Sequence, residues 1–158
     1  MKIAVYPGSF DPMTNGHIDI LNRALDVFDK VVVLIAVNPK KKYHFTIEEK
    51  IDMIKKAVKD DERVIVDSCT GLTVDYARKI GAKHLIRGLR AVTDFEYEFQ
   101  LAAANNFADE DIDMVFFMSK SDTSFISSST VMELYENGID VSRLVPKSVL
   151  EALNKLNK

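Results

Sequence analysis

The chain has 158 residues, of which 47% are hydrophobic and 28% charged, and its formal net charge is −3. This composition is typical of a globular protein, and the length is that of one domain. The small negative charge argues against a general basic field for nucleic acid or membranes, so an anionic ligand needs a local cluster of cations.

The cysteine content and the N-terminal sequence indicate where the protein works. One cysteine, Cys69, leaves no partner for an intrachain disulfide. The first apolar run is stopped by Pro7 and is too short for a signal peptide, and no run approaches the ~18 residues of a membrane span. We therefore expect a cytoplasmic enzyme or binding protein.

Short β-branched runs alternate with helical patterns along the chain, as in βαβ units. The run 31–37 is apolar without alternation, which is typical of a strand covered on both faces. Strands are expected at 3–6, 31–37, 63–67, 84–87 and 114–118, and helices at 16–28, 47–58, 72–80, 94–108, 128–136 and 146–156. The sequence predicts one α/β domain over residues 1–158, a Rossmann-like three-layer fold with a five-stranded parallel sheet in the order 3-2-1-4-5.

Local signals mark several of the expected helices. Thr46 and Glu49 have the spacing of a capping box at the start of the second helix, and Gly81 follows the third helix as a C′ glycine. The fourth helix presents Phe95 and Phe99 at helical spacing.

Three unusual loops follow the first, fourth and fifth expected strands, at 7–17, 87–90 and 124–130. The carboxyl ends of parallel strands lie at one edge of a sheet, and ligands bind there where the strand order reverses. In the order 3-2-1-4-5, strands one and four flank that point. We therefore expect the three loops to form one site.

The first loop indicates phosphate binding. Gly8 beside the strand end permits close approach of a ligand, and the N–H groups that begin the next helix suit an anion. Thr14, Gly16 and His17 fit a T-x-G-H pattern in which the imidazole donates to phosphate oxygens, with the hydroxyl of Ser9 nearby. A surface histidine that only caps the helix is the alternative.

The other loops supply cations and hydroxyls. Arg87 and Arg90 flank a glycine after the fourth strand and suit phosphate, although they could be solvated. The hydroxyl run 127–130 could wrap a β/γ-phosphate or merely cap a helix. The 118–121 segment, Met-Ser-Lys-Ser, only partly matches the K-M-S-K-S loop of class I aminoacyl-tRNA synthetases, so we assign the equivalent function to 126–130.

Two further charged segments have both a ligand-binding and a purely structural explanation. The lysine run 40–42 follows the second strand, where one lysine could bind phosphate or all three could be solvated. Asp94 favours the dipole of the fourth helix, and Glu98 could meet a ribose hydroxyl. His44, His84 and Cys69 have no partners at metal-ligand spacing, so we expect no protein-bound metal.

Five segments carry a resemblance to a known family: Tyr-Pro-Gly-Ser-Phe-Asp-Pro at 6–12, Gly-His at 16–17, Ile-Arg-Gly-Leu-Arg at 86–90, Asp-Phe-Glu-Tyr-Glu at 94–98 and Phe-Ile-Ser-Ser-Ser at 125–129. Together they resemble the bacterial phosphopantetheine adenylyltransferases of the nucleotidyltransferase superfamily. The resemblance spans essentially the whole chain. It implies transfer of AMP from ATP to 4′-phosphopantetheine with Mg²⁺, giving dephospho-CoA and pyrophosphate in the penultimate step of coenzyme A biosynthesis. It also implies a homohexamer inhibited by coenzyme A.

The resemblance assigns roles residue by residue. His17 is the expected catalytic residue, as a stabiliser of transition-state charge. The residues expected to meet ATP are Ser9, Phe10, His17, Gly88, Leu89, Arg90, Glu98, Thr123, Ser124, Phe125, Ile126, Ser127, Ser128 and Ser129. Those expected to meet phosphopantetheine are Ser9, Lys41, Thr73 and Arg87. Thr73 and Thr123 stand where the family commonly has bulkier apolar or aromatic side chains.

The acceptor would be a phosphate oxygen that is already anionic at neutral pH, so the reaction requires no general base. Catalysis then depends on substrate alignment and charge stabilisation. Two rival functions stay open at this point: another small nucleotidyltransferase with a different acceptor, and a nucleotide-binding module without turnover.

Overall fold

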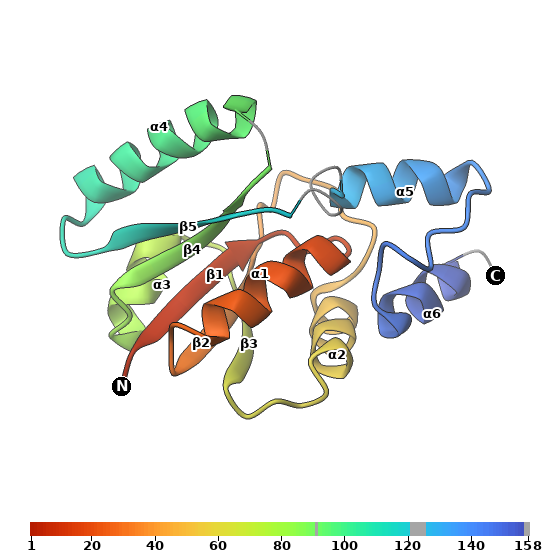
Figure 1. Ribbon diagram of the computed structural model, residues 1–158, viewed down its shortest axis with the longest axis horizontal. Helices are drawn as coiled ribbons and strands as arrows, with labels where there is room; N and C mark the ends of the chain where they lie inside the picture. The colour runs from red at the N-terminus through yellow and green to blue at the C-terminus, as the bar shows by residue number, and fades with distance from the viewer. Residues whose placement is uncertain (91, 121–125, 157–158) are drawn as a thin grey trace.

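The computed structural model describes residues 1–90, 92–120 and 126–156, with backbone alone for Val92 and Thr93. Its centre is a parallel sheet in the order β3-β2-β1-β4-β5, which confirms the predicted topology (Figure 1). The strands are β1 (Ile3–Gly8), β2 (Lys30–Ala36), β3 (Val64–Cys69), β4 (His84–Leu89) and β5 (Asp113–Met118). The helices are α1 (Asn15–Leu25), α2 (Ile47–Ala57), α3 (Thr73–Ile80), α4 (Val92–Ala108), α5 (Ser128–Glu136) and α6 (Lys147–Leu156).

β2 is covered on both faces, as its unbroken apolar run predicts. Val31, Val33 and Ile35 join a core cluster that includes residues of α1, α2, α5 and α6. Val32 and Leu34 point to the opposite face and join a second cluster with residues of α3. Because successive strand side chains alternate between faces, one run of five buried residues serves both helical layers.

Helix boundaries follow the local sequence signals. The Thr46 hydroxyl accepts from the Glu49 N–H, and the Glu49 carboxylate accepts from the Thr46 N–H, both at 3.1 Å, which confirms the capping box. Gly81 ends α3 in the left-handed region with φ 76°, as a C′ glycine should. α1 ends at Leu25, three residues earlier than expected, because the chain turns there to bury Phe28 in the core.

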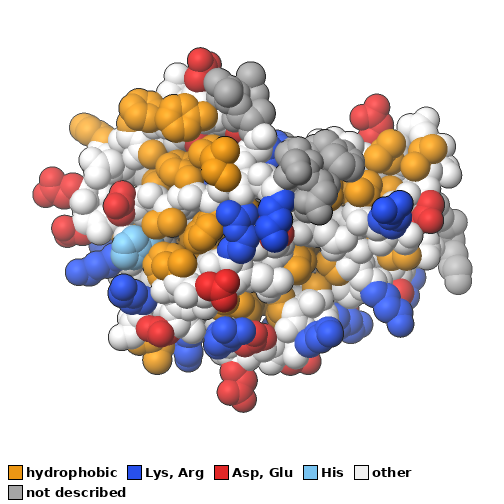
Figure 2. All heavy atoms as spheres, viewed as in Figure 1, with side chains coloured by type: hydrophobic (Ala, Val, Ile, Leu, Met, Phe, Trp, Pro, Cys, Tyr) orange, Lys and Arg blue, Asp and Glu red, His pale blue; other side chains and the backbone are white. Residues whose placement is uncertain are grey.

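α4 leaves its aromatic face uncovered within the described chain. Phe95, Phe99 and Phe107 are 51%, 63% and 93% exposed, so the face expected from helical spacing exists but points to solvent. Figure 2 shows hydrophobic side chains gathered over α4 at the upper left of the molecule. Among the described residues, no helix is long and apolar enough to cross a lipid bilayer.

Candidate active site

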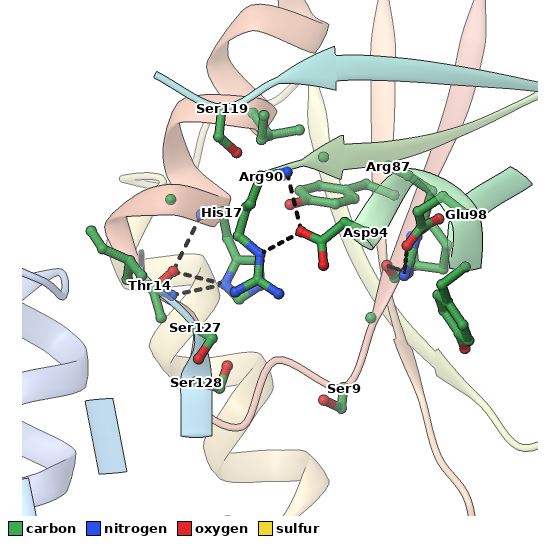
Figure 3. A pocket seen from close by; sticks show the side chains of 18 residues that line it. Ser9, Thr14, His17, Arg87, Arg90, Asp94, Glu98, Ser119, Ser127 and Ser128 are labelled. Carbon is green, nitrogen blue, oxygen red and sulfur yellow. Dashed lines mark hydrogen bonds and ion pairs between the residues drawn. The ribbon is translucent and has the colours of Figure 1, made fainter. Parts of the chain in front are cut away.

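A cavity of about 320 Å³ opens at the carboxyl ends of β1 and β4, where the strand order reverses (Figure 3). The first loop, the end of β4, the start of α4, the end of β5 and the start of α5 all contribute to its wall. The lining residues are Tyr6, Pro7, Gly8, Ser9, Thr14, Gly16, His17, Ile20, Arg87, Gly88, Arg90, Asp94, Tyr97, Glu98, Ser119, Ile126, Ser127 and Ser128. The three loops therefore meet, as expected from the sheet topology.

His17 is held in the cavity wall as a neutral hydrogen-bond donor. The backbone N–H of Thr14 donates to Nδ1 of His17 at 2.9 Å, which assigns the imidazole proton to Nε2. Burial, followed by the positive charges of Arg90 and Arg87, lowers the pKa of His17 from 6.5 to about 4. The same positive charges that oppose a protonated His17 favour an anionic ligand beside it.

The lowered pKa of His17 predicts that the unfolding free energy decreases as the pH falls from about 6.5 toward 4. In that interval the unfolded chain binds a proton at His17 and the folded chain does not. The contribution of His17 to the unfolding free energy is therefore fully present above pH 6.5 and is lost as the pH falls toward 4. The loss is at most about 3 kcal/mol. Urea unfolding between about pH 7 and 4.5 should give a flatter dependence for His17→Gln than for the parent, and equal slopes would contradict the assignment.

The side chain of Phe10 supports His17 from behind instead of lining the cavity. Phe10 is 2% exposed and has a φ of 46°, which is uncommon for a non-glycine residue. Its ring meets the rings of Tyr6 and His17 edge-on, with centroid distances of 5.4 and 5.0 Å. A Cβ on Gly8 would lie 3.1 Å from the Phe10 ring, so this glycine leaves space for the aromatic support.

Arg87 and Glu98 form a paired unit on one side of the cavity. Nε and Nη2 of Arg87 donate to the two carboxylate oxygens of Glu98 at 2.9 and 2.7 Å. Burial opposes the charge of Arg87, whereas Glu98 supports it, and the pKa of Arg87 is raised. The carboxylate of Glu98 thus orients the guanidinium, and any contact of Glu98 with ATP would share this group with Arg87.

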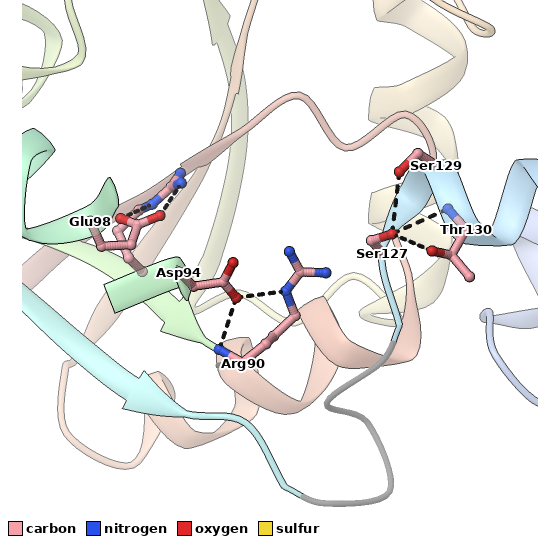
Figure 4. Close-up of polar contacts among 7 residues, drawn as sticks. Arg90, Asp94, Glu98, Ser127, Ser129 and Thr130 are labelled. Carbon is pink, nitrogen blue, oxygen red and sulfur yellow. Dashed lines mark hydrogen bonds and ion pairs between the residues drawn. The ribbon is translucent and has the colours of Figure 1, made fainter. Parts of the chain in front are cut away.

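Asp94 holds Arg90 in a similar way, a role that the helix-dipole interpretation of the sequence missed. Nε and the backbone N–H of Arg90 both donate to Oδ2 of Asp94 at 3.2 Å, while the terminal nitrogens project away from that carboxylate (Figure 4). Asp94 and Glu98 lie one helical turn apart and each pairs with an arginine from the end of β4. The i, i+4 spacing beside two arginines was the available sequence signal.

The start of α5 contributes hydroxyl groups to the cavity. Ser127 is the N-cap, and its Oγ accepts from the Thr130 N–H at 3.1 Å (Figure 4). Ser128 donates from Oγ to the carbonyl oxygen of Pro12 at 2.7 Å, which ties α5 to the first loop. The serines at the start of α5 therefore both cap the helix and line the cavity. Ser119, in the segment that partly matches K-M-S-K-S, also lines the cavity.

Several expected ligands lie away from this cavity wall. Leu89 is buried at the end of β4, and Ser129 is exposed on α5. Lys41 follows β2 and Thr73 begins α3 after β3, so both lie at the carboxyl edge of the sheet but on the other side of β1 from β4. Gly88, by contrast, lines the cavity and also approaches α1 closely, since a Cβ there would lie 3.2 Å from Ile20. The expected ligands Thr123, Ser124 and Phe125 lie outside the described residues.

The described residues do not form a metal site of their own. Asp94 and Glu98, the carboxylates that line the cavity, are each paired with an arginine, and the described chain has no cluster of three or more acidic, histidine or cysteine ligands. Mg²⁺ commonly binds through substrate phosphates with one or two carboxylates. A polyphosphate in this cavity would bring with it most of the oxygen ligands that such an ion needs.

A neutral histidine donor, two arginines and helix-start serines thus surround one cavity at the switch point of the sheet, an arrangement that suits the phosphates of a nucleotide. The chain belongs to the cytidylyltransferase-like family, whose model matches residues 5–134. Its relatives include proteins named phosphopantetheine adenylyltransferase. It is 50% identical to that of Geotalea daltonii, over 100% of this chain and 99% of the relative, and 48% identical to that of Lachnoclostridium phytofermentans, over 97% and 94%. The enzyme of that name from Clostridium botulinum is 46% identical over 100% and 99%.

Proposed function

We propose that the protein transfers AMP from ATP to 4′-phosphopantetheine, forming dephospho-CoA and pyrophosphate. An oxygen of the phosphopantetheine phosphate bonds to the α-phosphorus of ATP while the bond from that phosphorus to the β-phosphate bridging oxygen breaks. The observation that supports this most is the joint wall of His17, Arg87, Arg90 and Ser128 around one cavity, in a chain similar to these enzymes along its full length.

The geometry suits charge stabilisation without a general base. The acceptor phosphate is already anionic, and Nδ1 of His17 is occupied by a backbone N–H, which leaves Nε2–H as the donor of a ring that lines the cavity. A neutral donor aimed at oxygens that gain charge stabilises the transition state without a proton transfer. Arg90, held by Asp94, supplies a permanent positive charge beside it.

We place the nucleotide over β1, β4 and the start of α5, and the acceptor phosphate between Arg87 and the strand ends that precede Lys41 and Thr73. β2 and β3 lie on the opposite side of β1 from β4, so this division separates the donor and acceptor halves of the site. Ser9, in the loop after β1, lies between the halves and can serve both substrates.

We propose that Mg²⁺ is required and enters with the triphosphate, whose negative charge it offsets. The pairing of Asp94 and Glu98 with arginines supports this, because neither carboxylate is left to coordinate an ion alone. The residues of the chain bind and orient the phosphates around it.

The deciding experiment measures pyrophosphate release by the pure protein from MgATP, with and without phosphopantetheine. Release that depends on phosphopantetheine supports the proposal. Release with nicotinate mononucleotide instead, or from CTP with an alcohol phosphate, assigns a different transferase. Binding of ATP with no turnover by any acceptor makes the protein a nucleotide-binding module.

We further propose that the protein assembles as a homohexamer and is inhibited by coenzyme A, which shares the pantetheine and adenine-nucleotide parts of the product. The exposed aromatic face of α4 supports self-association, because contiguous exposed apolar side chains commonly mark protein contacts. Phe95 and Phe99 form one patch there, with ring centroids 6.1 Å apart.

Phe99→Asp is expected to shift the protein to smaller species, because it places a charge in the proposed contact. Sedimentation velocity measures the change. Val27→Asp is the matched control, since Val27 is 56% exposed on a different part of the surface and receives the same charge. An unchanged sedimentation coefficient for Phe99→Asp would remove α4 from the contact.

A further inference from the structure

Asp11 and Lys50 form a buried ion pair that the proposed chemistry does not use. Lys50 is 1% exposed and Asp11 is 8% exposed, and Nζ of Lys50 lies 3.8 Å from Oδ1 of Asp11. Burial lowers the pKa of Lys50, and the Asp11 carboxylate opposes this shift and favours the charged amine. An ion pair in the interior is often no more stabilising than apolar residues of the same size, so its presence calls for a reason beyond stability.

The pair joins two loops that are far apart in sequence. Oδ2 and Oδ1 of Asp11, in the loop after β1, accept from the backbone N–H groups of His44 and Phe45 at 2.8 and 3.0 Å. Lys50 comes from the first half of α2, and its Nζ lies 3.9 Å from the centroid of the Tyr43 ring. One carboxylate thus accepts two backbone hydrogen bonds and forms one ion pair with the 44–50 segment.

The same anchor closes the loop that carries the lysine run 40–42. The hydroxyl oxygen of Tyr43 accepts from the Asn38 N–H at 2.8 Å, across the base of the loop. Within the loop, the side-chain and backbone oxygens of Asn38 accept from the N–H groups of Lys40 and Lys41, each at 3.0 Å. The exposed lysines therefore stand on a turn whose base is fixed by Tyr43 and, through it, by Lys50.

We propose that Asp11 and Lys50 are positioning residues that hold Lys41 at a fixed place relative to Ser9, and so set the affinity for the acceptor phosphate. Asp11 lies two residues after Ser9, so it couples the two loops at the point where donor and acceptor halves meet. The inference rests on the proposed function in its choice of phosphopantetheine as the ligand of Lys41.

The test is Asp11→Asn, which keeps one acceptor oxygen, replaces the other with an amide NH₂ that cannot accept from a backbone N–H, and removes the counter-charge of Lys50. We expect the KM for phosphopantetheine to rise about tenfold and the KM for ATP to change less than about twofold. Asp52→Asn is the control, because Asp52 pairs with Lys56 on the exposed side of the same helix. An equal rise in both KM values would overturn the proposal.

A double-mutant cycle tests whether Asp11 acts through Lys41. In a Lys41→Ala background, Asp11→Asn should add little further increase to the KM for phosphopantetheine, because the side chain that it positions is already gone. Effects that simply multiply would overturn the proposal. Lys50→Met, which keeps both N–H bonds to Asp11, should shift the same KM in the same direction by a smaller factor, and it takes the place of Asp11→Asn in the cycle if that variant does not fold.

Limited trypsin digestion tests the anchor without any assay of turnover. Cleavage within the 40–42 run should be several-fold faster in Asp11→Asn than in the parent and in Asp52→Asn, with other cleavage sites unchanged. Equal cleavage rates would overturn the anchor. If the parent forms no pyrophosphate with phosphopantetheine, the proposed function fails while faster cleavage still establishes that Asp11 holds this loop.

Discussion

Replacing His17 with alanine is expected to lower kcat for pyrophosphate release by about 10²–10³ while the fold is kept. The alanine variant loses the Nε2–H donor. It also removes Nδ1, the acceptor of the Thr14 backbone N–H, but this N–H lies at a helix start beside an open cavity, so we expect the fold to survive. Steady-state kinetics with both substrates, together with thermal unfolding, measure the two effects separately.

His84→Ala provides the matched control for that loss. His84 begins β4 at the end of the sheet opposite the cavity, and its ring packs against Phe28 at a centroid distance of 5.4 Å. Its removal should cost some stability and leave kcat near the parent value. A His17→Ala variant with near-normal turnover would remove His17 from the catalytic role.

The convergence of the three loops could be predicted from the sequence because it depends on topology alone. An apolar run without alternation places β2 inside the sheet, and alternating helices and strands make the sheet parallel. Once the order 3-2-1-4-5 is chosen, the residues that follow β1, β4 and β5 must lie at one edge. His17 in the helix after β1, Arg87 near the carboxyl end of β4 and Ser127 at the start of the helix after β5 thus reach one cavity.

The tautomer and charge of His17 could not be predicted, because they depend on contacts that the sequence does not encode locally. Burial lowers the pKa of His17, and the nearby positive charges of Arg90 and Arg87 lower it further, so the imidazole is neutral. Phe10 packs against one side of the ring. The backbone bond from Thr14 to Nδ1 forms only when the capping geometry is in place. The two interpretations of His17 are compatible, because its imidazole completes the capping box of α1 and also lines the cavity.

α4 shows what the sequence pattern leaves undetermined. Its aromatic residues repeat at helical spacing, which ordinarily indicates a core face. In the structure, Glu98 is buried at 5% exposure and Phe99 is 63% exposed, so the polar side of the helix faces the sheet and the site. Periodicity identifies a face but not what covers it, and here the side of α4 that carries Asp94 and Glu98 pairs with Arg90 and Arg87.

Arg87→Ala should raise the KM for phosphopantetheine by roughly 10–100-fold, because a guanidinium contact to a phosphate is lost. The structure adds a second expected effect. Glu98, whose side chain is 6% exposed, is left as a buried carboxylate without its bidentate partner. We expect about 3 kcal/mol of destabilisation, at the lower end for such pairs because Arg87 is itself 26% exposed, and a drop of about 10 °C in Tm.

The double variant Arg87→Ala/Glu98→Gln separates the two effects. The neutral amide at 98 removes the buried charge, so most of the lost stability should return while the KM for phosphopantetheine stays high. Arg78→Ala is the control, since Arg78 is 56% exposed and ion pairs of an exposed side chain such as those with Asp75 and Asp109 contribute little to stability. If the double variant recovers the parent KM along with its stability, Arg87 serves the fold by neutralising Glu98 and does not hold the acceptor phosphate.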